Sequence, residues 1–82
     1  MNSIVEGIYL NDNCIEFSTG GAGRDYYCGI MWTPNGDPIG FGGASMNLVP
    51  SGIGWKYEEK DGDNRYYIER IIDNWFVYEM VF

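Results

Sequence analysis

The chain contains no histidine among its 82 residues, and only five lysines and arginines stand against twelve aspartates and glutamates. Without histidine there is no imidazole to act as a general base, to complete a catalytic triad or to ligate zinc. The net charge of -7 argues against nucleic acid or an anionic membrane as a direct partner, because both bind basic surfaces. We therefore expect no direct nucleic-acid binding and no membrane binding.

Long apolar runs are also missing, and the roughly 20 consecutive apolar residues that a membrane helix needs occur nowhere in the chain. The opening segment MNSIVEGIYL has no basic stretch followed by an apolar one, as a secretory leader would have. These two absences lead us to expect a cytoplasmic protein.

Metal and redox motifs are absent as well. Cys14 and Cys28 are the only two cysteines and form no CxxC pair, so we predict two small unpaired, buried side chains rather than a disulfide. The acidic stretch that begins with Asp61 and Asp63 fails as a calcium loop, because Arg65 occupies the position of the next ligand. We expect neither a metal nor another cofactor.

What the chain does contain is glycine and aromatic residues, with twelve glycines and an aromatic content of 17%. Short runs rich in β-branched and aromatic residues alternate with turn signals such as PNGD, DGDN and DN. This spacing predicts an all-β fold, a single small antiparallel meander of about six or seven short strands rolled as a barrel or sandwich, with little or no helix. We assign residues 1–82 to one domain.

The acidic run around residues 58–63 is predicted to end a β-hairpin. A tip at Gly62 and Asp63 would place Lys56 opposite Glu69, an ion pair, and Trp55 opposite Arg70, a cation–π contact, and these complementary pairs favour this register.

The final strand gives the most informative pattern. Carrying the pairing through the turn at residues 73–74 places Tyr78 opposite Glu69, Met80 opposite Tyr67 and Phe76 on the same face. Both faces of this strand are then largely apolar or aromatic, whereas a sheet with one wet face should alternate more cleanly. The strand is therefore buried on both sides, or its second face meets a partner protein or a second copy of the chain.

The segment DYYCGIMW, residues 25–32, alternates in the same way. Here Cys28, Ile30 and Trp32 are predicted to face the core, and Met31 is predicted to lie on a half-exposed face.

We hypothesise a non-enzymatic, acidic protein-binding module, a small inhibitor or antagonist of the type that opposes a defence system or neutralises a toxin. Its partner would be a protein with a basic surface, bound through aromatic side chains and steered by rim carboxylates. The predicted binding residues are Glu58, Asp61, Asp63, Tyr67, Glu69, Phe76, Tyr78 and Met80.

Two other functions are compatible with the sequence. The glycine-rich segments 20–23 and 40–43, together with the aromatic residues, could surround a pocket for a nucleotide or a sugar. Alternatively, the second apolar face could be the interface of a homodimer or a larger structural homo-oligomer. The acidic charge could also serve only to keep an aromatic-rich protein in solution.

Overall fold

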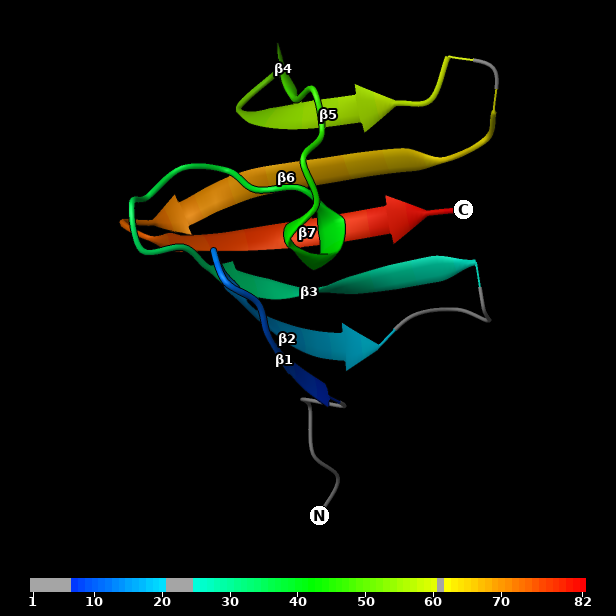
Figure 1. Cartoon of the computed structure of the whole chain (residues 1–82). Coiled ribbons are helices and arrows are strands. Elements are labelled where there is room, and N and C mark those ends of the chain that lie inside the picture. The colour runs from blue at the N-terminus through cyan, green and yellow to red at the C-terminus, as the bar shows by residue number, and fades with distance from the viewer. Residues whose placement is uncertain (1–6, 21–24, 61) are drawn as a thin grey trace.

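Seven antiparallel strands form one open sheet in the computed structural model, which describes residues 7–20, 25–60 and 62–82 (Figure 1). The strands are β1 (Gly7–Leu10), β2 (Ile15–Gly20), β3 (Tyr26–Trp32), β4 (Val49–Ser51), β5 (Gly54–Glu58), β6 (Arg65–Ile72) and β7 (Trp75–Val81). The only helical element in these ranges is a 3-10 turn, η1 (Phe41–Gly43). The predicted all-β fold is confirmed. No helix of the described part is long and apolar enough to cross a membrane.

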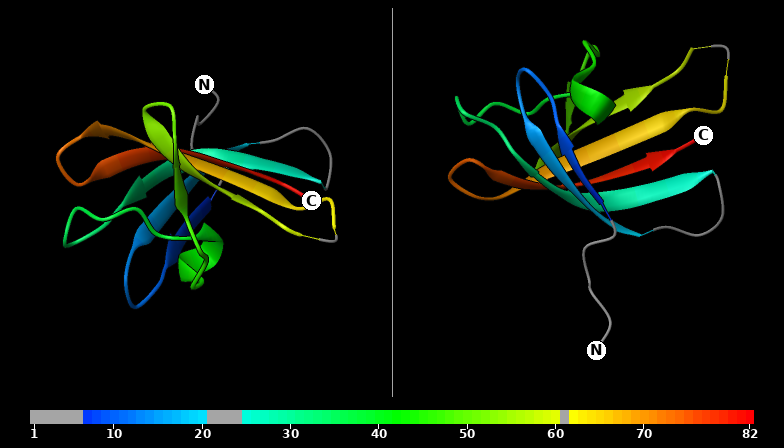
Figure 2. Two further views of the ribbon diagram at one scale, coloured as in Figure 1. Left: turned by 90° about the horizontal axis from the view of Figure 1, so that it is seen from above. Right: turned by 60° about the horizontal axis from the view of Figure 1, so that its bottom comes forward.

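The order of the strands in the sheet is β1-β2-β3-β7-β6-β5-β4, so the chain is not a continuous meander. After β3, residues 33–48 cross one face of the sheet and carry η1 in front of β7 (Figure 1). The chain then returns from β4 at the far edge, and β7 pairs with both β3 and β6. The sheet is twisted, and its edge strands β1 and β4 do not pair, so it does not close (Figure 2).

The core lies between the sheet and the crossing segment, and we call this side of the sheet the covered face. Met31, Ile68 and Phe76 have no solvent exposure at all. The Tyr66 hydroxyl donates a hydrogen bond of 2.8 Å to the carbonyl oxygen of Ile39, which anchors the crossing segment to β6. The core is completed by Cys14, Tyr66, Tyr78 and Met80, against which Ile39, Phe41, Met46, Leu48, Trp55 and Tyr57 pack.

A β-bulge changes the predicted pairing of β6 with β7. Ile72 lies opposite Trp75, as predicted, but the register then shifts between Arg70 and Ile72. The extra residue, Ile71, leaves Arg70 opposite Phe76, with its guanidinium 5.2 Å from the ring centroid. Because side chains alternate between faces along a strand, this single insertion moves residues 65–70 of β6 to the other face relative to β7.

The bulge makes the predicted partners in this hairpin wrong. Tyr78 lies opposite Ile68 and not opposite Glu69, while Met80 lies opposite the residue that precedes Tyr67. Tyr78 and Met80 therefore share the covered face with the buried side of β6, and not with Tyr67 and Glu69.

The β5–β6 hairpin is also shifted, by two residues. Trp55 lies opposite Ile68, so its predicted contact with Arg70 is wrong. Lys56 pairs with the residue two before Glu69, so the predicted cross-strand ion pair is wrong as well. A shift of two residues preserves which residues share a face, because the side-chain period of a strand is two.

The predicted faces of β3 are reversed. Gly29 and Met31 are buried on the covered face, whereas Cys28, Ile30 and Trp32 lie on the opposite face and are only partly buried. The crossing segment covers the side that carries Met31, and this long-range contact determines which face becomes the core.

Both cysteines are free thiols, as predicted. Cys14 is buried in the core, and burial raises the pKa of its thiol above the ordinary value. Cys28 is only partly buried.

Candidate functional site: an uncovered apolar sheet face

The face of the sheet opposite the crossing segment, which we call the open face, carries two neighbouring rows of apolar side chains. Each row consists of side chains that lie opposite one another on neighbouring strands. The first row runs across β1, β2, β3 and β7, and the second row runs across the same four strands and β6. We call these nine residues the apolar patch: Ile8, Phe17, Ile30 and Val77 in the first row, and Leu10, Ile15, Trp32, Trp75 and Ile72 in the second.

Five of the nine residues of the apolar patch are exposed to solvent, and the other four, Ile15, Phe17, Ile30 and Trp32, are half-buried. Leu10 is 78% exposed and Ile72 is 61% exposed, while Trp75 and Val77 are each 38% exposed. Phe17 and Trp75 contact across the intervening strand β3, with ring centroids 5.9 Å apart. Contiguous apolar surface of this kind is typical of an interaction site, whereas isolated exposed apolar residues are common on any protein.

Charged and phenolic side chains border the apolar patch on the same open face. Along β5 and β6, Lys56 and Glu58 form an ion pair of 3.1 Å, and the Tyr67 hydroxyl donates a 2.9 Å hydrogen bond to Glu69 Oε1. The hydrogen bond to the carboxylate of Glu69 raises the pKa of Tyr67, because it stabilises the protonated phenol. The polar border consists of Tyr26, Lys56, Glu58, Arg65, Tyr67, Glu69 and Glu79.

Part of the predicted binding set lies in this border. Glu58, Tyr67 and Glu69 are on the open face, within the polar border. Asp63 is exposed in the turn that connects β5 to β6. Asp61 lies outside the described residues.

The other three predicted binding residues lie elsewhere. Phe76, Tyr78 and Met80 are at most 4% exposed and form part of the core, so their assignment to an exposed second face is wrong. The exposed face of β7 carries their neighbours Trp75 and Val77 instead, because side chains alternate between the two faces along a strand. The sequence carries the relevant signal, a final strand apolar on both faces, but the unforeseen bulge reversed which residues belong to which face.

No group of three or more cysteines, aspartates or glutamates gathers as a metal site in the described ranges. Comparison of the chain with protein-family models, with curated proteins and with solved structures gives no match.

Proposed function

We propose that this chain is a non-enzymatic protein-binding module and that its partner docks on the open face. The observation that supports this proposal is the asymmetry of the sheet. One face is covered by the crossing segment, whereas the other leaves aromatic and aliphatic side chains such as Phe17, Trp32 and Trp75 in one contiguous patch. Large aromatic side chains at the centre of an interface supply much of its binding energy.

The charge of the chain favours a partner of opposite sign over a second copy. The net charge is -7, so two copies repel each other as they approach. Within the polar border, Glu58 already neutralises Lys56, while Glu69 and Glu79 form no ion pair among the described residues. A protein with an apolar ridge flanked by lysines or arginines would complement both the apolar patch and its border.

An inhibitor or antagonist is the role that we propose for such a module. A small acidic domain that occupies the basic surface of another protein blocks whatever that surface binds. This role belongs to the class that opposes a defence system or neutralises a toxin. The support for it is the net charge of the chain and the exposed residues of the apolar patch.

A matched pair of variants tests the proposal. Val77→Lys places a charge within the apolar patch, whereas Ile53→Lys makes the same change at a residue that is 79% exposed in the turn between β4 and β5. We expect wild type and Ile53→Lys to retain the same partner from host extract and Val77→Lys to lose it, with retention decreasing as salt is raised.

Light scattering of the purified chain provides the second measurement. We expect a monomer, because the proposed occupant is a different, basic protein. A stable dimer that Val77→Lys dissociates would assign the open face to self-association and overturn the proposal. Equal partner retention by Val77→Lys and wild type would also overturn it.

A further inference from the structure

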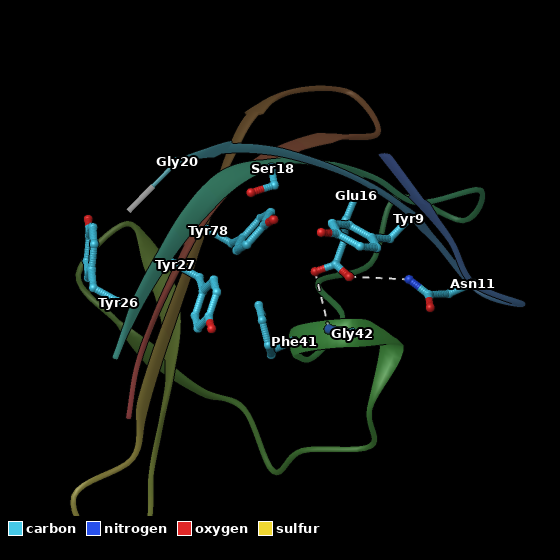
Figure 3. Close-up of a pocket in the computed structure, with 10 residues that line it drawn as sticks. All are labelled: Tyr9, Asn11, Glu16, Ser18, Gly20, Tyr26, Tyr27, Phe41, Gly42 and Tyr78. Atoms are coloured by element: carbon cyan, nitrogen blue, oxygen red, sulfur yellow. Dashed lines mark hydrogen bonds between the residues drawn. The ribbon is translucent and has the colours of Figure 1, made fainter. Parts of the chain in front are cut away.

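A second site lies on the covered face, beside η1, and the proposed protein-binding function does not use it. Here the sheet leaves a hollow of about 540 Å³ between β1–β3 and η1 (Figure 3). This volume lies within the range of about 300–1,000 Å³ that is usual for small-molecule pockets. Its lining residues are Tyr9, Asn11, Glu16, Ser18, Gly20, Tyr26, Tyr27, Phe41, Gly42 and Tyr78. Of these, Tyr26 lies at the rim, and its hydroxyl donates a hydrogen bond to Glu79 in the polar border of the open face.

Among the described residues, Glu16 is the only charged one in this lining, and it is only 3% exposed. One carboxylate oxygen, Oε1, accepts a 3.3 Å hydrogen bond from the Asn11 side chain, and Oε2 accepts a 3.2 Å hydrogen bond from the backbone N–H of Gly42. Both donors are neutral, and Glu16 forms no ion pair with any described residue. A buried carboxylate is normally paired with a cation, and no residue of the described ranges provides one here.

Aromatic rings form the other walls of the hollow. Figure 3 shows the rings of Tyr9, Tyr27, Phe41 and Tyr78 arranged around the space into which the Glu16 carboxylate points. Phe41 lies 5.7 Å from Tyr27 and 6.1 Å from Tyr78, measured between ring centroids. The faces of such rings carry negative electrostatic potential and attract cations.

The backbone holds these walls in place. The β1–β2 end of the sheet curls toward the side that carries η1 (Figure 2). The Asn13 side chain donates a 3.1 Å hydrogen bond to the carbonyl oxygen of Gly43, so the β1–β2 turn is tied to η1. Two of the glycine positions that the sequence suggested for a pocket, Gly20 and Gly42, do lie in this lining.

We propose that this hollow binds an organic ammonium ion, with the cationic nitrogen near the Glu16 carboxylate and an apolar body between the tyrosine and phenylalanine rings. Aromatic walls with one carboxylate are the usual arrangement for recognising an alkylated or protonated amine. The described residues of the lining disfavour phosphates and carboxylates, because they include an acid and no base. The Ser18 hydroxyl adds a polar group that can orient the guest.

A set of three isosteric probes tests the charge preference. Tyramine, tyrosol and 4-hydroxyphenylacetate share a phenol and an ethyl or methylene linker, and end in an ammonium, a hydroxyl and a carboxylate. Titration followed by amide NMR should shift the signals of Ser18 and Gly42 with tyramine, and tyramine should bind about tenfold or more tightly than tyrosol. We expect no measurable binding of 4-hydroxyphenylacetate.

Two variants separate a specific site from general attraction of cations to an acidic protein. Glu16→Gln should weaken tyramine binding about tenfold or more, whereas Asp73→Asn, which removes the same unit of charge from an exposed turn, should leave it unchanged. Tyr27→Leu preserves bulk but removes one aromatic wall, and should weaken binding about threefold. Tyr27→Leu also keeps the test valid if Glu16→Gln does not fold, because Glu16 also holds η1.

Three results would overturn this proposal. They are the absence of NMR shifts at millimolar tyramine, equal binding of tyramine and 4-hydroxyphenylacetate, and an Asp73→Asn effect as large as that of Glu16→Gln. None of them bears on the open face, because the hollow and the apolar patch lie on opposite sides of the sheet.

Discussion

Gly29 and Tyr78 lie directly opposite each other in the β3–β7 pair, and the tyrosine side chain crosses over the glycine. A Cβ atom added to Gly29 would lie 2.7 Å from Tyr78 Oη and would also collide with the carbonyl oxygen of Phe17. Tyr78 is buried in the core and also lines the hollow beside η1. The missing side chain at Gly29 is therefore what lets Tyr78 serve both the core and the hollow.

Replacing Gly29 with alanine should destabilise the fold, because part of the collision is with backbone that cannot move aside. We expect a loss of about 1–3 kcal/mol in the free energy of unfolding, as is usual for overpacking a core. Urea unfolding measures the change. Gly52→Ala is the control, because its added Cβ meets nothing within 4 Å and the variant suffers only from a φ of 60°. A Gly29→Ala variant as stable as wild type would show that Tyr78 does not lie over Gly29.

Neighbouring residues of β7 should respond very differently to truncation. Phe76→Ala removes a ring with no solvent exposure that packs 6.3 Å from the ring of Trp55, so we expect a loss of about 3–5 kcal/mol in unfolding free energy. Trp75→Ala removes a larger side chain from the open face and should cost about 1 kcal/mol, mainly its contact with Phe17.

Urea unfolding of both variants tests which residues of β7 lie in the core and which lie on the open face. If Phe76→Ala does not fold, Phe76→Leu provides a milder change in the same direction. A larger loss for Trp75→Ala than for the Phe76 variant would mean that the faces of β7 are assigned the wrong way round.

Glu16 should make stability depend on pH in a direction opposite to that of a salt-bridged acid. Burial raises the pKa of Glu16 above its ordinary value of 4.5, although hydrogen bonds from Gly42 and Asn11 partly lower it. The folded protein therefore retains this proton where the unfolded chain has lost it, so the contribution of Glu16 to stability falls as pH rises between the unfolded and the folded pKa.

Unfolding curves of wild type and Glu16→Gln across this range of pH measure the effect. The stability of Glu16→Gln relative to wild type should increase with pH within the window and become constant above it. Cys14, Tyr66 and Tyr78 also face Glu16, and burial raises the pKa of each, so they stay protonated throughout. A relative stability that is constant from acid to neutral pH would contradict the raised pKa.

The local chemistry of the sequence predicted the elements well. Turn residues such as Asp73 and Asn74 separate short segments rich in aromatic and β-branched residues, and the all-β class follows from these local preferences. The unpaired cysteines and the last strand with apolar residues on both faces could also be predicted from the sequence, because both depend on residue type and spacing alone. For the candidate site, the prediction correctly placed Glu58, Tyr67 and Glu69 on one surface of the sheet.

Only the tertiary structure decided which face of the sheet is covered and forms the core, and which face is exposed to solvent. One extra residue, Ile71, reverses the faces of β6 relative to β7, and no local preference in the sequence marks it. The crossing of residues 33–48 then covers one face, buries Phe76 and Met31 and leaves Trp75 exposed. The hollow around Glu16 likewise forms because β1, β2 and η1 meet there, from segments distant in the chain. Composition and spacing thus determined that strands form, whereas long-range packing determined where the core and the two proposed sites lie.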